Sequence, residues 1–316
     1  MKILLIGTGN VGLMHGWVLS EAGVDVTHVV HKGSLGKHAH DIQMDVMDMR
    51  RGVPEKYMAS YSPKVVDEVS PNDSYDLVIV ATNHLQAVDA VKEYKDKTPS
   101  ANFLMYCANW NGLDEFDALL GRRRYLWGYS VFSGAKGSDG LLYANIQGTY
   151  RIGELPGGPA GMLDKINETF SKAQIKPDIK ENIIEWLWIH FAVNAGMLGT
   201  ILVEGAMPSS STPLDVWVFI IRSVRDALNV LEARGVNYRN YPDTKVFQIE
   251  NDEQAARMLR EGMMDMPHYE RTMAHSHVHS NPGEMKSYYL DVVETGERLG
   301  VPIEYLGSIK DKIRSL

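Results

Sequence analysis

His190 and Asn194 stand four residues apart in an apolar stretch, EWLWIHFAVNAG. Side chains at positions i and i+4 of a helix share one face, so both would reach the same space. An imidazole, with an unperturbed pKa of about 6.5, can donate a proton at neutral pH, and an amide can orient a substrate. The pair therefore has the chemistry to protonate an oxygen on which negative charge develops. The alternative is a half-buried core histidine that donates to a backbone carbonyl.

A second chemical signal is the hexapeptide GTGNVG, which has the spacing G-x-G-x-x-G. Glycines at this spacing permit a tight turn, close approach to a pyrophosphate and close packing of a helix on a strand. The helix that follows supplies unpaired N–H groups for the phosphates. The motif predicts a dinucleotide-binding loop, with a glycine-rich structural turn as the alternative. Its residues are Gly7, Thr8, Gly9, Asn10, Val11 and Gly12.

The end of the next expected strand distinguishes between the two nicotinamide dinucleotides. An NAD site usually has Asp or Glu there, which accepts hydrogen bonds from the ribose hydroxyls. This chain reads VVHKGS, so the strand ends in His31 and Lys32 without an acid. A cationic end suits the 2′-phosphate and predicts NADP(H), while a solvated pair at a strand end is the alternative.

These residues must be positioned by regular elements, and the first half of the chain alternates apolar runs with helical patterns. Such alternation predicts a parallel sheet covered on both faces. The predicted strands are Lys2–Ile6, Asp25–His31, Asp76–Ala81, Asn102–Cys107 and Tyr125–Val131. The predicted helices between them are Asn10–Glu21, Gln86–Lys95 and Asp114–Leu120. Two extended segments around Gln147-Gly148, within Leu141–Ile152, predict a hairpin at the sheet edge.

The second half is mostly helical, which predicts a helical bundle. Its predicted helices are Met162–Ala173, Ile183–Leu202, Pro213–Arg234, Asp252–His275 and Glu284–Leu299. The expected fold class is α/β, with an N-terminal Rossmann dinucleotide-binding domain over residues 1–177. A C-terminal all-helical domain over residues 178–316 would follow, because the helix from Met162 can still pack on the sheet.

Composition excludes several classes of protein. A chain of 316 residues suits two domains, and its net charge of −8 argues against a nucleic-acid binder. The single cysteine, Cys107, cannot form an intramolecular disulfide, which favours a reducing, cytoplasmic setting. The run Ile3–Ile6 is too short for a signal peptide, and no apolar segment approaches the roughly 20 residues that span a bilayer. We therefore expect no membrane partner.

Together the motifs resemble the ketopantoate reductase (2-dehydropantoate 2-reductase) family over nearly the whole chain. Besides GTGNVG, the resemblance rests on DLVIVATNHLQAVDAV, ANWNGLDEF, GYSVFSGAKGSDG, EWLWIHFAVN and GEMKSYYLDVVETGERLGVP. It implies a dinucleotide-binding sheet followed by a helical domain, with the active site in the cleft. It also implies NADPH-dependent reduction of a small 2-keto acid to a 2-hydroxy acid, as in pantothenate biosynthesis, without a metal.

The resemblance assigns roles residue by residue. Asn109 matches an asparagine near the nicotinamide and the substrate, and Asn194 matches a substrate-binding asparagine. Thr272 matches a substrate-binding serine, and Glu284 matches an active-site glutamate. His190 falls where the family has its general-acid lysine.

Several positions depart from the family pattern. Asn83 replaces a lysine at the end of the third strand, Leu198 a second helical asparagine, and Trp110 a glycine. GEMK replaces TEID, and the segment from residue 41 to 52 lacks the usual extended pattern. These departures favour an NADP-dependent dehydrogenase of the same scaffold that acts on a different keto or hydroxy acid or an imine. A dinucleotide-binding or sensing protein without catalysis is a further alternative.

Two other features, a run of alternating histidines and an apolar helix surface, have ordinary structural explanations. His275, His277 and His279 alternate and would align in an extended chain, but no carboxylate stands at ligand spacing, so no metal site is predicted. One expected helix carries a large apolar surface, which favours either a homodimer through the helical half or burial against its own chain. The residues of this surface are Val216, Trp217, Phe219 and Ile220.

Overall fold

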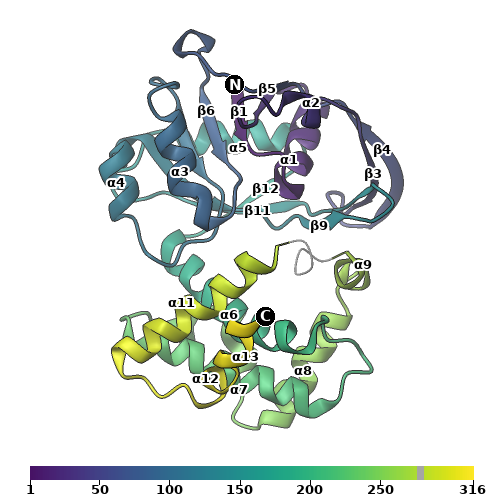
Figure 1. The fold of residues 1–316 in the computed structure, drawn as a ribbon, viewed down its shortest axis with the longest axis vertical. Coiled ribbons are helices and arrows are strands. Elements are labelled where there is room, and N and C mark those ends of the chain that lie inside the picture. The colour runs from purple at the N-terminus through teal and green to yellow at the C-terminus, as the bar shows by residue number, and fades with distance from the viewer. Residues whose placement is uncertain (276–280) are drawn as a thin grey trace. The chain divides into compact units, whose positions relative to one another are not determined.

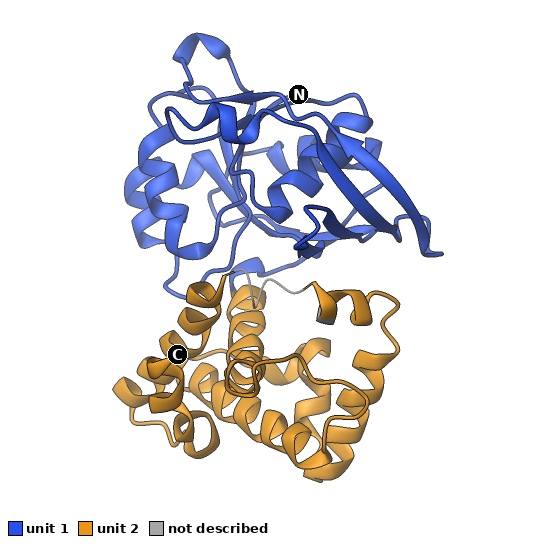
Figure 2. Ribbon diagram, turned by 45° about the vertical axis from the view of Figure 1, so that its right-hand side comes forward, with its two compact units in different colours: residues 1–184 blue, residues 185–316 orange. Residues whose placement is uncertain are grey.

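The computed structural model describes residues 1–275 and 281–316 (Figure 1). The chain divides into two compact units, Met1–Ile184 and Glu185–Leu316 (Figure 2). The predicted class is confirmed: a Rossmann-like parallel sheet forms the N-terminal unit and helices form the C-terminal one. The boundary expected between residues 177 and 178 falls inside β12 (Lys176–Ile179), which pairs with the sheet, and the units divide a few residues later.

The N-terminal unit is built on an eight-stranded sheet in the order β12-β11-β8-β7-β6-β1-β2-β5. Its other strands are β1 (Lys2–Ile6), β2 (Asp25–Val29), β5 (Val65–Val66), β6 (Leu77–Val80), β7 (Asn102–Met105), β8 (Tyr125–Tyr129) and β11 (Thr149–Gly153). The strands from β5 to β8 in this order are parallel, and β11 joins β8 antiparallel. Strand order reverses at β1, so the carboxyl ends of β1 and β6 form the switch point at which open α/β sheets bind ligands.

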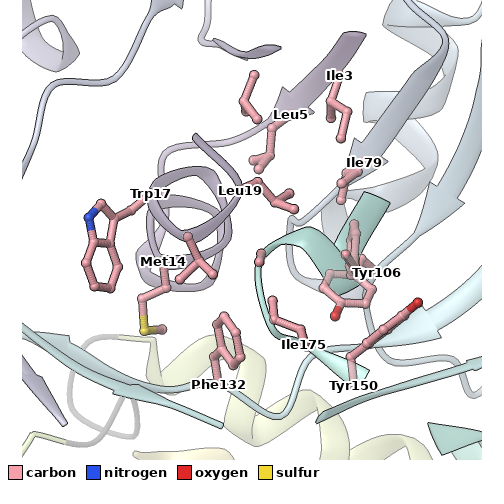
Figure 3. Packing of buried hydrophobic residues seen from close by; sticks show 14 of the residues in the cluster. Ile3, Leu5, Met14, Trp17, Leu19, Ile79, Tyr106, Phe132, Tyr150 and Ile175 are labelled. Carbon is pink, nitrogen blue, oxygen red and sulfur yellow. The ribbon is translucent and has the colours of Figure 1, made fainter. Parts of the chain in front are cut away.

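The core of this unit forms where α1 packs on the sheet. The helices of the unit are α1 (Asn10–Glu21), α2 (Leu35–His38), α3 (His84–Tyr94), α4 (Asp114–Leu120) and α5 (Met162–Lys172). Figure 3 shows Leu5 of β1 and Met14 of α1 among the buried side chains of this cluster. All four residues of β6 are buried, as expected for a strand with both faces covered.

A smaller sheet of four strands, in the order β4-β3-β10-β9, completes the unit. Its strands are β3 (Ile42–Asp48), β4 (Glu55–Tyr61), β9 (Ser133–Lys136) and β10 (Leu142–Ile146). The predicted hairpin around Gln147-Gly148 is therefore wrong, because β10 pairs with β3 and β9 whereas β11 pairs with β8 and β12. The two extended segments exist, but β10 lies between β3 and β9 in the small sheet and β11 lies between β8 and β12 in the large one.

The described residues of the C-terminal unit contain helices and no strand. The helices are α6 (Ile183–Glu204), α7 (Leu214–Ala233), α8 (Asp252–Met264), α9 (Tyr269–Ala274), α11 (Pro282–Leu299), α12 (Glu304–Ser308) and α13 (Lys310–Ser315). The helix predicted over Asp252–His275 is two helices, and Pro267, which cannot donate an intrahelical hydrogen bond, lies in the break.

Helix α6 is the central helix of this unit, and two glycines let its neighbours approach. A Cβ on Gly196 would come within 2.6 Å of the Val224 backbone in α7, and one on Gly199 within 2.5 Å of the Tyr289 ring in α11. Contrary to the sequence expectation, α6 is long and apolar enough to cross a membrane by length and composition. However, 56% of its apolar window is buried in the protein, which is typical of a core helix.

The apolar surface of α7 is partly explained by its own chain. Trp217 and Ile220 are fully buried, and the ring of Phe219 contacts Tyr305 of α12 edge to face. Val216 stays partly exposed. Burial within the chain therefore accounts for much of the surface from which a homodimer was considered.

Candidate active site

Glycine is explained differently at each of the three glycine positions of GTGNVG. Gly7 has φ +104°, a conformation that side chains rarely adopt. A Cβ on Gly12 would lie 2.8 Å from the Gly7 carbonyl oxygen, so α1 can pack on β1 only without one. Gly9 has an ordinary extended conformation, and among the described residues no atom lies within 4 Å of its would-be Cβ. The fold does not require glycine at position 9, which leaves the close approach of a ligand as the reason for it.

The start of α1 is suited to an anion. Its N-cap, Gly9, offers no side-chain hydrogen bond, and its first turn contains no acidic residue, so the first N–H groups remain available. The end of β6 lies against the loop, since a Cβ on Gly7 would lie 3.7 Å from the Ala81 carbonyl oxygen. The loop thus lies at the switch point of the sheet, and its residues fit the pyrophosphate of a dinucleotide.

A buried histidine that the sequence analysis missed supports this loop. Nδ1 of His28, a fully buried residue of β2, lies 3.2 Å from the Gly7 carbonyl oxygen and Nε2 lies 3.0 Å from the Tyr61 hydroxyl. Burial lowers the pKa of His28 to about 4, against a smaller opposing effect of the Gly7 hydrogen bond. The neutral ring therefore donates from Nδ1 to Gly7 and accepts from Tyr61. Only a glycine at position 16 leaves room, because a Cβ there would lie 2.2 Å from His28 Nε2.

We expect His28→Ala to lower the free energy of unfolding by about 2–4 kcal/mol, because it leaves a cavity and strands two buried polar groups. Tyr61→Phe, which removes only the hydroxyl, should cost about 1 kcal/mol. Urea denaturation measures both, and cofactor titration should show weaker binding by the His28→Ala variant because the loop loses its support. A His28→Ala variant as stable as the parent would contradict this role.

The end of β2 differs from the sequence expectation. His31 and Lys32 follow β2 as predicted, but two acids from the end of β5 lie beside them. Lys32 Nζ is 2.5 Å from Glu68 Oε1, and Glu68 raises the pKa of Lys32. The Gly33 N–H donates to Asp67 at 2.9 Å. β2 itself ends without an acid, as the sequence indicates, but the residues after β5 place two acids beside that end.

A second imidazole lies at the loop itself. Nδ1 of His38, the last residue of α2, is 2.9 Å from the Thr8 hydroxyl. His38 is not among the residues predicted from the sequence, and its only signal there is its place in the basic segment HKGSLGKHAH. His38 ties that segment to the middle of GTGNVG.

Asn83 and Asn109 follow the neighbouring strands β6 and β7, at the same edge of the sheet as the glycine loop. Asn83 is the N-cap of α3, and its Oδ1 accepts from the Gln86 N–H at 3.0 Å. The buried Asn109 accepts from the Gly112 N–H at 2.9 Å and donates to the Gly112 carbonyl at 2.8 Å. The two side chains therefore hold the backbone at Gln86 and at Gly112. Both lie at the edge of the sheet where the candidate cofactor residues of the N-terminal unit are found.

In the C-terminal unit, His190 and Asn194 form the pair expected from their spacing. Both are half-buried on α6, and Asn194 Nδ2 lies 2.8 Å from His190 Nε2. An amide nitrogen can only donate, so Nε2 accepts and the proton of the neutral ring is on Nδ1. If the Asn194 side-chain amide flipped, so that Oδ1 and Nδ2 exchanged places, Oδ1 would accept a hydrogen bond from a protonated Nε2. Trp186 stacks on the imidazole at 5.1 Å between ring centroids and donates to Asp243 at 2.9 Å.

Glu284 lies in the first turn of α11, the helix that packs beside α6. Its carboxylate accepts from the Asn281 amide at 2.8 Å. Burial raises the pKa of Glu284 to about 7, and the Asn281 hydrogen bond offsets part of this effect. Phe191, next to His190, stacks on Tyr288, one turn after Glu284, at 4.2 Å between centroids. The two helix segments that carry the candidate acid and the candidate glutamate therefore pack side by side.

The remaining candidates are Thr272 and the alternating histidines. Thr272 is a half-buried residue of α9, which Tyr269 anchors by donating to the Pro208 carbonyl at 2.8 Å. His277 and His279 lie outside the described residues. Within residues 1–275 and 281–316, no group of three or more His, Cys, Asp or Glu side chains is arranged to hold a metal ion.

Glu284 makes stability depend on pH. Its pKa rises from about 4.5 in the unfolded chain to about 7 in the folded protein, so folding favours the protonated form. The resulting stabilisation is fully present below about pH 4.5 and is lost as pH rises through about 7. We expect the unfolding free energy to fall less between about pH 5 and pH 8 in a Glu284→Gln variant than in the parent, measured by urea denaturation.

Asp291 on the same helix needs a matched Asp291→Asn variant, because burial raises its pKa to about 6 and acts in the same direction. Equal pH dependence of the parent and the Glu284→Gln variant would show that Glu284 titrates in its ordinary range.

The fold and the loop define a class: a Rossmann dinucleotide-binding protein with a helical second unit. A family model described as ketopantoate reductase PanE/ApbA matches residues 3–157. This match and the curated relatives support a place in the ketopantoate reductase family. The family indicates an oxidoreductase that acts on a CH–OH group, and a nicotinamide dinucleotide is the cofactor that the comparisons support.

Similar proteins agree with this assignment. The 2-dehydropantoate 2-reductase of Pyrococcus horikoshii is 26% identical over 227 residues, which cover 70% of this chain and 71% of the relative. A ternary structure of D-mandelate dehydrogenase with NADH and anilino(oxo)acetate has a TM-score of 0.72 at 15% identity, covering 100% and 98% of the two chains. The 2-dehydropantoate 2-reductase from Geobacter metallireducens GS-15 has a TM-score of 0.71 at 14% identity, covering 100% and 99%. The two structures share the fold.

Proposed function

We propose that the protein reduces a small 2-keto acid to the 2-hydroxy acid with NADPH, as a ketopantoate reductase does. The observation that carries this proposal is the hydrogen-bonded pair of His190 and Asn194 on one face of α6, which the family resemblance assigns to catalysis. The glycine loop supports the cofactor part, because Gly9 has open space and the start of α1 is uncapped by side chains.

The reaction needs a hydride and a proton. When bound, the reduced nicotinamide supplies the hydride to the keto carbon. His190 donates a proton to the carbonyl oxygen as negative charge builds there. The Asn194 amide holds the imidazole and can turn to bond either protonation state. Glu284, whose pKa is about 7, would stabilise the protonated imidazole when ionised.

The polar side chains that the family resemblance assigns to substrate binding would orient the substrate. Asn194 and Thr272 would bind its carboxylate or hydroxyl group. The amide of Asn109 is hydrogen-bonded to Gly112. Asn109 would therefore help to orient the substrate indirectly, by fixing the loop next to the nicotinamide. His31, Lys32 and Asn83 would complete the cofactor site, with Lys32 carrying the charge that suits a 2′-phosphate.

Ketopantoate is the first candidate substrate, because curated relatives in the family are 2-dehydropantoate 2-reductases. A second candidate is an aromatic 2-keto acid such as phenylglyoxylate. The D-mandelate dehydrogenase neighbours favour it, and Leu198 replaces the family's second helical asparagine.

The test follows oxidation of NADPH and NADH with a panel of 2-keto acids that includes ketopantoate, aliphatic homologues and phenylglyoxylate. We expect turnover with at least one member and a preference for NADPH. Tight cofactor binding without turnover of any 2-keto acid, in either direction, would instead favour the dinucleotide-binding or sensing alternative.

The same proposal includes a cytoplasmic homodimer. A ketopantoate reductase from Staphylococcus aureus is described as dimeric, and Val216 on α7 of this chain is partly exposed. Light scattering coupled to gel filtration measures the molar mass. A monomer at every concentration tested would contradict the dimer without affecting the proposed reaction.

A further inference from the structure

We propose that Glu68 sets the preference between NADPH and NADH by competing with the 2′-phosphate for Lys32. This inference rests on the proposed binding of a nicotinamide dinucleotide at GTGNVG. It identifies a specificity-determining residue in the loop after β5, a part of the chain to which no role was assigned from the sequence.

The register of the sheet brings the acids to the cofactor edge. β5 pairs with β2 in parallel, with Val65 opposite His28 and Val66 opposite Val29. The Val30 N–H donates to the Val66 carbonyl at 3.0 Å, so the pairing continues one step further. The residues after β5, Asp67 and Glu68, therefore run beside the last residues of β2. An NAD site has its acid at this place, usually on the second strand itself.

The two acids have different tasks. Asp67 accepts from the Gly33 N–H at 2.9 Å and so fixes the turn after β2. Glu68 instead holds the side chain of Lys32 at 2.5 Å. Both partners of this pair are largely exposed, at 82% for Lys32 and 69% for Glu68. No packing confines the ammonium, so it can leave Glu68 for another anion.

Charge decides which anion Lys32 prefers. An exposed ion pair such as Lys32–Glu68 contributes little to stability, whereas a phosphate monoester carries a charge of about −1.5 to −2 near neutral pH. Lys32 therefore moves to the 2′-phosphate when NADPH binds. The carboxylate of Glu68 then remains nearby, unpaired, and repels the phosphate. With NADH, the same carboxylate can accept hydrogen bonds from the ribose hydroxyls while Lys32 stays paired.

The surrounding charges act in favour of the phosphate and leave Glu68 as the opposing group. The segment HKGSLGKHAH after β2 contains Lys37, His38 and His40 besides His31 and Lys32, and no acid. His38 is tied to the loop through Thr8. Removing the charge of Glu68 should therefore raise the affinity for NADPH relative to NADH, rather than weaken the binding of both cofactors.

The experiment measures dissociation constants of NADPH and NADH by fluorescence titration of the full-length parent and three variants. We expect Glu68→Gln to tighten NADPH binding about fivefold and to change NADH binding less than about threefold in the opposite direction. Lys32→Ala should weaken NADPH binding about tenfold or more and NADH binding less than about twofold. Glu93→Gln is the matched control, since Glu93 pairs with Lys97 on the exposed side of α3.

The outcomes separate this inference from the proposed function. If Glu68→Gln changes the affinity for both cofactors by the same factor, or for neither, Glu68 does not select between them. If the parent binds neither NADPH nor NADH, the cofactor part of the proposed function fails, and the inference fails with it. A shift of the same size in the Glu93→Gln control would attribute the effect to net charge and overturn the specific role of Glu68.

Discussion

Replacing His190 by phenylalanine is expected to lower kcat about a hundredfold to ten-thousandfold, the usual contribution of a general acid. A phenyl ring can keep the stack on Trp186, which lies 5.1 Å from the imidazole between centroids, but it cannot donate a proton. The packing of α6 should therefore survive while proton transfer is lost. Oxidation of the reduced cofactor measures kcat, and urea denaturation checks that the fold is intact.

Two further variants distinguish catalysis from packing. Added imidazole should partly restore the activity of a His190→Ala variant, which a purely structural histidine would not allow. His190→Lys should raise the reduction of ketopantoate if the histidine occupies the family's acid position. Retention of parental kcat by the His190→Phe variant would make His190 a core histidine and remove it from the mechanism.

A comparable effect on binding is expected from Gly9→Val, which should weaken cofactor binding at least about a hundredfold. No atom of residues 1–275 or 281–316 lies within 4 Å of the added Cβ, so the new side chain would occupy the space proposed for the pyrophosphate. Valine in place of the N-cap glycine of α1 should cost the fold about 1 kcal/mol. Calorimetric titration with the dinucleotide measures the loss.

Gly12→Val is the matched control within the same motif. Its Cβ would lie 2.8 Å from the Gly7 carbonyl oxygen and 3.0 Å from the Leu5 side chain, so α1 would have to move. We expect a loss of about 3 kcal/mol in the free energy of unfolding, measured in urea. Parental affinity in the Gly9→Val variant would mean that the pyrophosphate binds elsewhere. Parental stability in the Gly12→Val variant would mean that the helix does not pack as described.

The features of the fold that were predicted correctly are those that neighbouring residues specify. The helices Asn10–Glu21 and Asp114–Leu120 and the strand Lys2–Ile6 have the bounds expected from the sequence. The pairing of His190 with Asn194 followed in the same way from the helical repeat. In each case the pattern lies within one or two turns or one strand, so no distant partner was needed to recognise it.

The errors concern partners that are distant along the chain. The extended segments before and after Gln147-Gly148 were recognised, but their assignment to one hairpin was wrong because they pair in different sheets. The break at Pro267 is an exception, because proline is itself a local signal that ends a helix. His28 was missed because an isolated histidine in a strand shows neither its burial nor its contact with Gly7.

The sequence by itself determined the fold class, the glycine-rich loop and the helix face that carries His190, because each depends on spacing within a few residues. Only the tertiary structure decided which acids meet Lys32, since Asp67 and Glu68 reach the end of β2 through the parallel register of β5. Likewise it decided that Glu284 is buried enough to raise its pKa to about 7. Charge and burial at a site depend on what the fold brings beside each residue, and local sequence patterns do not encode those neighbours.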